Sequence, residues 1–367
     1  MELTVDRKQL TDSLETVTSV VPSKPAIASL SCVLVETKDA EVSLTATDLE
    51  TTIKTSLPAT VSKKGQILLP ARKILSLVKQ LDDKELKLSL AESQVNLQTS
   101  SSTYNFFPMN VEDFPKLPKF SGGISFSISS SLLRDSIQKT KFCIYPEEPR
   151  PHFRGALLDI KEDKWNFVAT DTRRLALVQT NLETKVGQNV KCLLPYRVMN
   201  YLSSLLKEGS AEVSIGKNQI FLKVNGTYII SQLLEGSEDF PDYWKVIPDE
   251  KKQQIATVSR ELFESVLKRI TLFTSERYNK VKFIFSPEKL SLSVSNPEVG
   301  EAQEKIAIDY TGAEQPIAFN PDYLLQFLQC ITAEKVIIAF SGEKKPVLMR
   351  PQDSQEYLYV AMPLKLD

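Results

Sequence analysis

The chain has 367 residues, which is long enough for two to three domains of ordinary size. Hydrophobic residues make up 42% and charged residues 25% of it, which are proportions of a folded globular protein rather than of a disordered or fibrous one. The formal net charge of −1 excludes a protein that is basic over its whole surface, but it leaves room for one basic face.

Residue types also limit the chemistry. The single histidine, His152, lies in a proline-broken segment, and any Ser–His–Asp or Cys–His site would have to use it. We predict that it is a surface residue and that the chain has no catalytic residue, metal or cofactor. The cysteines are far apart, so we expect buried free thiols in a reducing cytoplasm. They are Cys32, Cys143, Cys192 and Cys330.

The sequence suggests neither a signal peptide nor a membrane span. The N-terminus carries acid and base before any apolar run, unlike a signal peptide. No apolar stretch approaches the eighteen or so residues that a membrane span needs. We therefore expect a cytoplasmic protein that does not bind a membrane.

Three stretches repeat one pattern along the chain. Each has a short alternating piece, a possible helix N-cap and then apolar residues at helical spacing. The stretches begin at Leu3, Phe126 and Ala256, and their N-caps are Asp6, Ser129 and Ser259. They predict a strand followed by a helix over residues 7–17, 131–142 and 259–270.

A second set of three stretches lies about sixty residues further on in each case. It starts at Ile67, Cys192 and Ile317 and places Pro70, Pro195 and Pro321 near a first helical turn, where the missing N–H costs nothing. Helices are predicted over 70–81, 195–207 and 321–331. Runs of period two follow, which are typical of antiparallel sheet with one wet face. Examples are Leu86–Leu88–Leu90, Val95–Leu97, Ile220–Leu222–Val224 and Leu290–Leu292–Val294.

The sequence EDFP occurs at 112–115 and again at 238–241, near the end of the first and second repeats. Gly, Ser and charge follow each copy, as in linkers. The chain is therefore predicted to be an α+β protein of three repeated domains, 1–122, 123–250 and 251–367, each with two strand–helix–strands units. Such repeats could form a linear array or curve into a ring.

Basic residues concentrate on the predicted helices. Taken in chain order, the helices carry net charges of 0, +3, +2, +2, +1 and −1, so together they carry +7 and the rest of the chain −8. Solvated helix faces would explain any one of them. If the repeats share an axis, however, the helices form one basic surface, which would attract phosphates without reading sequence.

Three motifs in this order resemble one known family. VATDTRRLALV at 168–178, FPDYWKVIP at 240–248 and YVAMPLKL at 359–366 are similar to the bacterial sliding clamps, the beta subunits of DNA polymerase III, and the likeness extends over the whole chain. It implies antiparallel sheets outside, helices inside, and a head-to-tail homodimer that closes into a ring around double-stranded DNA. It also implies a processivity factor without catalysis, whose partners are the clamp loader, the polymerase III alpha subunit and other proteins with a clamp-binding motif.

The resemblance also implies a partner-peptide cleft between the second and third domains. By position it comprises Phe153, Thr170, Thr172, Arg173, Arg174, Leu175, Pro241, Lys245, Val246, Val360, Met362, Pro363 and Leu364. Arg173, Arg174 and Lys245 are expected to add polar contacts at its rim. From the pattern alone, Val360–Leu364 would instead be a last buried edge strand.

Two further sets of residues follow from the resemblance. The residues expected to face DNA are Lys24, Arg72, Lys73, Lys79, Arg134, Lys139, Lys141, Arg150, Arg197, Lys207 and Lys268. Those expected at the dimer interface are Phe106, opposite Leu272 and Phe273, and the acids Glu298, Glu301 and Glu304, which would face bases such as Lys73.

Two other classes of function stay open on the residues alone. An enzyme could use the Thr-Asp pairs at 47–48 and 170–171, but no GxSxG, P-loop or GxGxxG motif accompanies them. Because the pairs recur inside a structural repeat, we predict that they cap strand ends. A scaffold that binds only proteins could use the same repeats without DNA.

Overall fold

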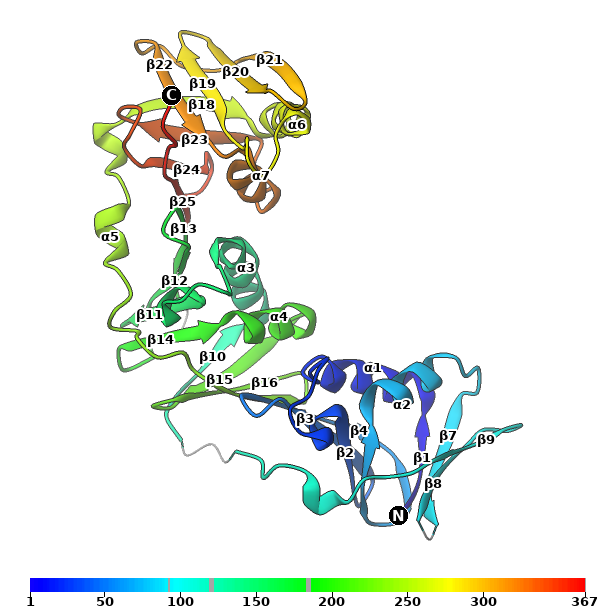
Figure 1. Ribbon diagram of the computed structural model, residues 1–367. Helices are drawn as coiled ribbons and strands as arrows, with labels where there is room; N and C mark the ends of the chain where they lie inside the picture. Colours follow the sequence, from blue (N-terminus) through cyan, green and yellow to red (C-terminus); the bar gives the residue numbers. More distant parts are fainter. Residues whose placement is uncertain (92, 119–121, 183–185, 367) are drawn as a thin grey trace. The chain divides into compact units, whose positions relative to one another are not determined.

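The computed structural model describes residues 1–91, 93–118, 122–182 and 186–366 (Figure 1). The chain forms two compact units. Unit 1 contains residues 1–133 and 200–233, and unit 2 contains residues 134–199 and 234–367. Two of the borders between them fall inside helices α3 (Ser130–Thr140) and α4 (Tyr196–Leu205), and the third lies between residues 233 and 234.

Unit 1 holds a five-stranded and an eight-stranded antiparallel sheet. The first has the order β5 (Thr60–Lys63), β1 (Glu2–Asp6), β7 (Glu85–Ala91), β8 (Gln94–Gln98) and β9 (Thr103–Phe106). The second has the order β10 (Ile124–Ser129), β15 (Ser210–Ile215), β16 (Gln219–Val224), β17 (Thr227–Gln232), β4 (Thr51–Pro58), β3 (Glu41–Thr47), β2 (Cys32–Lys38) and β6 (Gln66–Pro70). Helices α1 (Arg7–Thr18) and α2 (Ala71–Lys79) pack side by side, and α1 covers β3 and β4 (Figure 1).

Unit 2 repeats this plan with an eight-stranded and a four-stranded sheet. The first has the order β14 (Val190–Pro195), β11 (Gly155–Lys161), β12 (Lys164–Thr170), β13 (Arg174–Asn181), β25 (Tyr357–Ala361), β24 (Val347–Pro351), β23 (Lys335–Phe340) and β18 (Gln254–Ser259). The second has the order β21 (Gly300–Ala307), β20 (Lys289–Asn296), β19 (Val281–Ser286) and β22 (Gln315–Phe319). Helices α6 (Arg260–Ile270) and α7 (Pro321–Gln329) pack against each other.

The predicted helices are confirmed with ends that differ by two residues or fewer. Asp6 caps α1 by accepting a hydrogen bond from the Gln9 amide at 2.9 Å, and Ser259 caps α6 through the Leu262 amide at 3.5 Å. Pro321 is the first residue of α7 and Pro70 is the N-cap of α2. The runs of period two lie within β7, β8, β16 and β20 as predicted.

Both eight-stranded sheets continue across the expected domain boundaries. β4 of the first repeat pairs with β17 of the second, and β13 of the second pairs with β25 of the third. Compact units therefore join strands from neighbouring repeats, and their borders do not coincide with residues 122 and 250. Those domain boundaries stay a prediction.

Residues in line across each eight-stranded sheet form an apolar row. In unit 1 this row runs through Ala46, Ile53, Ile229, Leu222, Val213 and Phe126. In unit 2 it runs through Ala169, Ala176, Tyr359, Met349, Ile338 and Ala256. The Tyr359 hydroxyl donates to the Tyr323 carbonyl of α7 at 2.8 Å, so this is the face that the helices cover.

The smaller sheets carry the two halves of a third such row. One half runs through Tyr104, Leu97, Leu88 and Leu3 and ends at the free edge of β9. The other half joins Val294 to Ala302 on β21, which is also an edge strand. In the complete rows β4 pairs with β17 and β13 pairs with β25, whereas, among the described residues, β9 and β21, where the half-rows end, have no such partner in their sheets.

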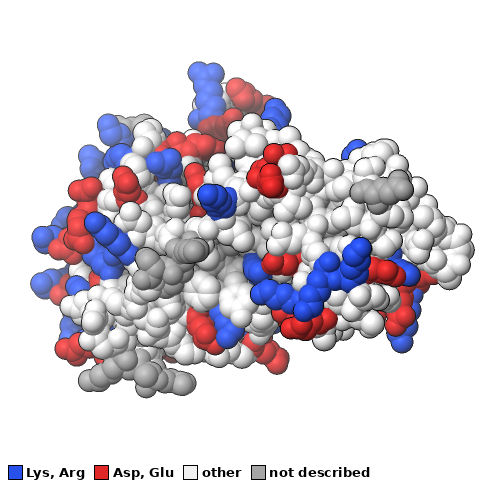
Figure 2. All heavy atoms as spheres, turned by 90° about the horizontal axis from the view of Figure 1, so that it is seen from below, with Lys and Arg blue, Asp and Glu red and all other residues white. Residues whose placement is uncertain are grey.

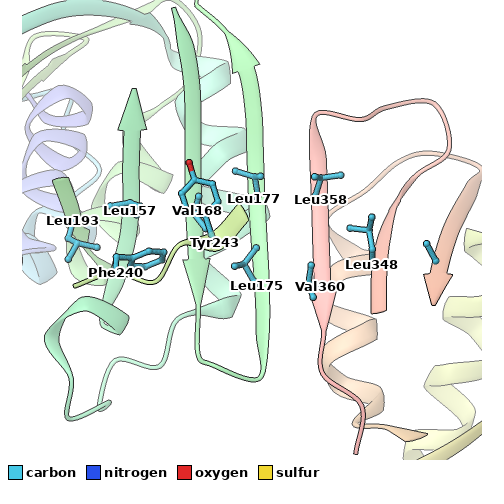
Figure 3. Packing of buried hydrophobic residues seen from close by; sticks show 11 residues of the cluster. Leu157, Val168, Leu175, Leu177, Leu193, Phe240, Tyr243, Leu348, Leu358 and Val360 are labelled. Atoms are coloured by element: carbon cyan, nitrogen blue, oxygen red, sulfur yellow. The ribbon is translucent and has the colours of Figure 1, made fainter. Parts of the chain in front are cut away.

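The repeated EDFP sequence anchors the connector that follows each repeat. Phe114 is buried against Cys32 and Leu68 in unit 1. Phe240, which is 5% exposed, is buried with Leu157 and Leu193 in unit 2 (Figure 3). The phenylalanine of the motif is therefore a core residue in both copies, which gives a physical reason for its recurrence.

Three of the four cysteines are buried free thiols, as predicted, whereas Cys330 is partly exposed. Among the described residues no group of three or more His, Cys, Asp and Glu side chains is placed to hold a metal ion. Within the same residues, no helix combines the length and the apolar character that crossing a membrane would take.

Replacing the buried Phe240 by alanine should lower the free energy of unfolding by about 3–5 kcal/mol, because a cavity replaces a well-packed ring. Urea denaturation followed by circular dichroism would measure it. Tyr145→Ala removes an aromatic side chain that is half exposed and should cost less than about 1 kcal/mol. Equal costs for the two variants would contradict a core role for the motif.

Candidate functional site

All the residues predicted to form the peptide cleft lie in unit 2. Strands β13 and β25 pair antiparallel there, with Leu175 opposite Val360 and Arg174 opposite Ala361. Just beyond these strands, the Met362 amide donates to the Arg173 carbonyl at 2.8 Å. β25 is an inner strand of the sheet, so the alternative of a terminal edge strand is wrong for Val360.

The predicted cleft residues divide into a buried floor and an exposed rim. Val246 and Met362 are each 37% exposed and are the apolar side chains at the rim. The other exposed members are Thr172, Arg173 and Lys245, and Pro241, Pro363 and Leu364 are half-buried. The buried members are Phe153, Thr170, Arg174, Leu175 and Val360.

A tight turn between β12 and β13 presents Thr172 and Arg173. The Thr170 hydroxyl donates to the Arg174 carbonyl at 2.7 Å, and Asp171 accepts hydrogen bonds from the amides of Arg173 and Arg174. Thr172 has a φ of +73°, a strained value for a residue with a β-branched side chain. The equivalent pair Thr47–Asp48 makes the same bonds in unit 1, which confirms the prediction that Thr-Asp pairs cap strand ends.

The prediction that Arg174 contributes to the rim is wrong. Its guanidinium is buried, where it forms an ion pair with Asp171 at 2.9 Å and donates to Gln326 and to the Phe142 carbonyl. It also lies over the Tyr323 ring at 4.3 Å. Arg174 therefore ties β13 to α7 from the helical side of the sheet and cannot reach a ligand in the cleft.

The connector after β17 forms one wall of the site and is held at two points. The Tyr243 hydroxyl donates to Asp159 at 2.8 Å, and burial together with this bond raises the pKa of Tyr243. Further on, Arg350 makes two hydrogen bonds of 2.7 and 2.8 Å to Glu250, which lower the pKa of that carboxyl group. Between these anchors lie Lys245 and Val246, so the rim residues stand on a fixed segment.

The floor of the site is apolar. Figure 3 shows Leu175 and Leu177 on β13 beside Leu358 and Val360 on β25, with Tyr243 of the connector over β12 and β13. Directly across the sheet, one line of paired residues runs through Leu193, Leu157, Val168, Leu177 and Leu358. We call this line the outer row.

The equivalent outer rows elsewhere in the chain contain polar residues. The first residue of each row is the one that forms an isolated β-bridge with the segment near the end of its repeat. These bridges are Leu68–Met109, Leu193–Leu234 and Ala318–Leu364. In unit 1 the outer row is Leu68, Leu34, Thr45, Lys54 and Tyr228. On the four-stranded sheet it is Ala318, Lys282, Ser293 and Gln303. Of these three rows, that of unit 2 is apolar throughout, and its residues Leu193, Leu157, Val168 and Leu177 are buried.

The residues predicted to face DNA are spread over both units. Lys24, Arg72, Lys73, Lys79 and Lys207 belong to unit 1, and Arg134, Lys139, Lys141, Arg150, Arg197 and Lys268 to unit 2. Several are neutralised by nearby acids: Lys79 pairs with Glu15, Arg150 with Glu148 and Lys268 with Glu264, at 2.6–2.7 Å. Figure 2 shows one face of the molecule on which bases and acids alternate.

The predicted dimer residues lie at or beside two of the edge strands, β9 and β21. Phe106 ends β9 in unit 1, while Leu272 and Phe273 follow α6 in unit 2 beside β21. Leu272 is 74% exposed, and Phe106 and Phe273 are half-buried. Glu304 already pairs with Arg269 of its own chain at 2.6 Å, which lowers its pKa, whereas Glu298 is exposed. Glu301 accepts from Ser295 at 2.9 Å.

Some exposed apolar residues were missed by the sequence analysis. Phe107 is 74% exposed next to the end of β9, and Val299 is 53% exposed at the start of β21. Trp244, which is 47% exposed, lies on the connector beside Lys245. The signal for Phe107 was the Phe106–Phe107 pair, because neighbouring residues of a strand point to opposite faces. His152 is half-buried against Phe153, with ring centroids 4.3 Å apart, and is less exposed than predicted.

Family models match nearly the whole chain in three consecutive parts. They are described as the N-terminal, central and C-terminal domains of the DNA polymerase III beta subunit, and they match residues 1–118, 127–242 and 244–365.

Individual relatives agree with these matches. The chain is 31% identical over 368 residues to the beta sliding clamp of Chlamydia muridarum, covering all of this chain and 99% of that one. Among solved structures, it is similar to the Pseudomonas aeruginosa DNA polymerase sliding clamp with ligand, at a TM-score of 0.94 and 28% identity. The Bartonella birtlesii sliding clamp bound to griselimycin gives a TM-score of 0.95 and 30% identity. Both comparisons cover all of each chain.

Proposed function

The chain belongs to the DNA polymerase III beta subunit family, the beta sliding clamps, and from this premise we propose how its residues perform the work of a clamp. The family role is that of a DNA sliding clamp, a processivity factor that has no catalysis of its own. Two proposals follow: the two free sheet edges join two chains head to tail, and the apolar outer row with its rim is the docking cleft for partner peptides.

The free edges support a head-to-tail dimer. In both complete rows the fourth strand of one repeat pairs with the last strand of the next, Ile53 with Ile229 and Ala176 with Tyr359. The unpaired equivalents are Ala302 on β21 and Tyr104 on β9. An exposed strand edge with apolar neighbours is a template for pairing with another chain. Because each chain has one β9 edge and one β21 edge, two chains offer two such junctions, and a closed ring pairs both of these edges.

The helices supply the surface that such a ring would turn toward DNA. Most of the bases predicted to face DNA lie on or just after α2, α3, α4 and α6, which occupy equivalent positions in the repeats, whereas Lys24 and Arg150 lie in connecting segments. Phosphate contacts by lysine and arginine attract duplex DNA whatever its sequence. Partial pairing with acids, such as Lys79 with Glu15, would keep this attraction weak enough for sliding.

The outer row of unit 2 supports the proposed cleft. Its floor is apolar where the other two repeats have threonine, lysine, serine or glutamine at the equivalent positions. Val246 and Met362 offer exposed apolar contacts, and Arg173 and Lys245 offer charge at the rim. A short peptide with apolar anchors fits this chemistry, since buried anchors carry most binding energy at such sites.

The occupants of the cleft would be segments of replication proteins. We propose the polymerase III alpha subunit, the clamp loader and other proteins with a clamp-binding motif as partners, acting in the cytoplasm where bacterial DNA is copied. We further propose that the three domains meet near residues 122 and 250. The first position lies between the matched ranges 1–118 and 127–242, whereas the second lies just inside the range 244–365.

The first prediction of this function concerns topology. Clamp loaded by its clamp loader and ATP onto a nicked circular plasmid should co-elute with the DNA in gel filtration, and cutting the circle once should release it. Leu272→Ala with Phe273→Ala is the control, because removing large buried side chains costs about 2–5 kcal/mol and should leave monomers that are not retained. Equal retention on the circle and on the linear product would refute a ring.

The second prediction concerns the cleft. Val246→Ala with Met362→Ala should weaken binding of a labelled alpha-subunit peptide that carries the clamp-binding motif by about tenfold or more, roughly 1.4 kcal/mol. Fluorescence anisotropy measures this affinity.

Unit 1 provides the matched control for the cleft variant. Gln232 takes the place of Met362 there, because its amide donates to the Glu50 carbonyl at 2.9 Å as Met362 does to Arg173. Gln232→Ala should leave the affinity unchanged. If Gln232→Ala weakens peptide binding and the Val246→Ala, Met362→Ala variant does not, the docking site lies in unit 1, where β4 pairs with β17.

A further inference from the structure

A buried asparagine lies beneath the proposed dimer face. Asn296 is the last residue of β20, and it is 1% exposed. Its Nδ2 donates to the Phe273 carbonyl at 3.1 Å and lies 3.5 Å from the Ser275 hydroxyl. Its Oδ1 accepts from the Glu298 amide at 3.0 Å. One side chain thus joins the turn after α6 to the hairpin between β20 and β21.

The two segments that Asn296 joins carry the exposed apolar side chains of this edge. The turn is the 3₁₀ segment Thr271–Phe273, which presents Leu272, and the hairpin presents Val299. The Phe273 ring closes the gap between them: a Cβ added at Gly300 would lie 3.9 Å from that ring. Gly300 has a φ of +134°, a backbone conformation that suits glycine.

We propose that Asn296 is a positioning residue for assembly, a latch that holds Leu272 and Phe273 in the geometry that the partner edge β9 requires. The proposal rests on the head-to-tail dimer described above. Large exposed apolar groups lose less freedom on binding when they are ordered beforehand. Without the latch, the Phe273 carbonyl loses its partner, and the turn becomes free to move away from β21.

An alternative link between the same elements cannot replace Asn296. Arg269 on α6 pairs with Glu304 on β21, but Arg269 is about half exposed and precedes the turn. Exposed ion pairs contribute little and are screened by salt. A buried amide hydrogen bond is directional, and leaving its partner unsatisfied is costly. Asn296 is therefore the contact that orients the turn itself.

The test compares the dimer dissociation constant of the full chain and of Asn296→Ala by sedimentation velocity over nanomolar to micromolar concentrations. The latch predicts a rise of about tenfold or more, and faster hydrogen exchange of residues 271–275. Asn166→Ala is the matched control, since Asn166 is also buried in a strand and donates to a backbone carbonyl, that of Asp159, at 3.2 Å. It should lower stability by a similar amount and leave the dimer unchanged.

Gly300→Ala disturbs the same hairpin by another route, because a φ of +134° is strained for alanine, and should also weaken the dimer, so the inference does not depend on the folding of one variant. If the wild-type chain dimerises and both Asn296→Ala and Gly300→Ala have the same dissociation constant as the wild type, the positioning role of Asn296 is refuted while the dimer stands. A wild-type chain that is monomeric throughout overturns the dimer and the latch with it.

Discussion

The structure depends on one constraint: the fourth strand of each repeat must find a partner on the next repeat. Backbone N–H and C=O groups at a strand edge need hydrogen bonds, and apolar rows on the sheet need a continuation. Inside the chain β17 meets β4 and β25 meets β13, and each pairing produces an eight-stranded sheet with an unbroken apolar row. Two strands, β21 and β9, lack this kind of partner within the described part of the chain. The pairing that joins repeats inside one chain can therefore also join two chains.

Function arises where the repeats differ from one another. The helix-facing rows stay apolar in every repeat because they form the core. The outer rows have diverged: Val168 and Leu177 in the second repeat correspond to Thr45 and Lys54 in the first. A symmetric scaffold thus gains one apolar docking surface per chain rather than three. Arg174, which pairs with Asp171 of the same repeat, also donates to Gln326 and so joins β13 to α7 of the third repeat beneath that surface.

Much of this was predictable from the sequence, because hydrophobic periods and helix caps are local signals. The helices, the antiparallel strands, the internal repeat and the Thr-Asp turns were all found that way. Burial of Arg174 was not, because adjacent arginines in ATDTRRL look alike until the strand assigns them to opposite faces. The sequence also does not show which residues pair on neighbouring strands. The contrast between the outer rows and the role of Asn296 could therefore be seen only in the structure.

The most direct measurement of the central claim is disulfide trapping of the free edges. If β21 pairs with β9 as β13 pairs with β25, Ala302 lies opposite Tyr104 of a second chain, within the Cα separation of about 4.4–6.8 Å that a disulfide allows. The double variant Tyr104→Cys with Ala302→Cys should then form a covalent dimer under mild oxidation, and Phe106→Cys with Ala302→Cys, shifted by two residues, should not. Equal trapping of both pairs, or of neither, would contradict the pairing rule on which the account depends.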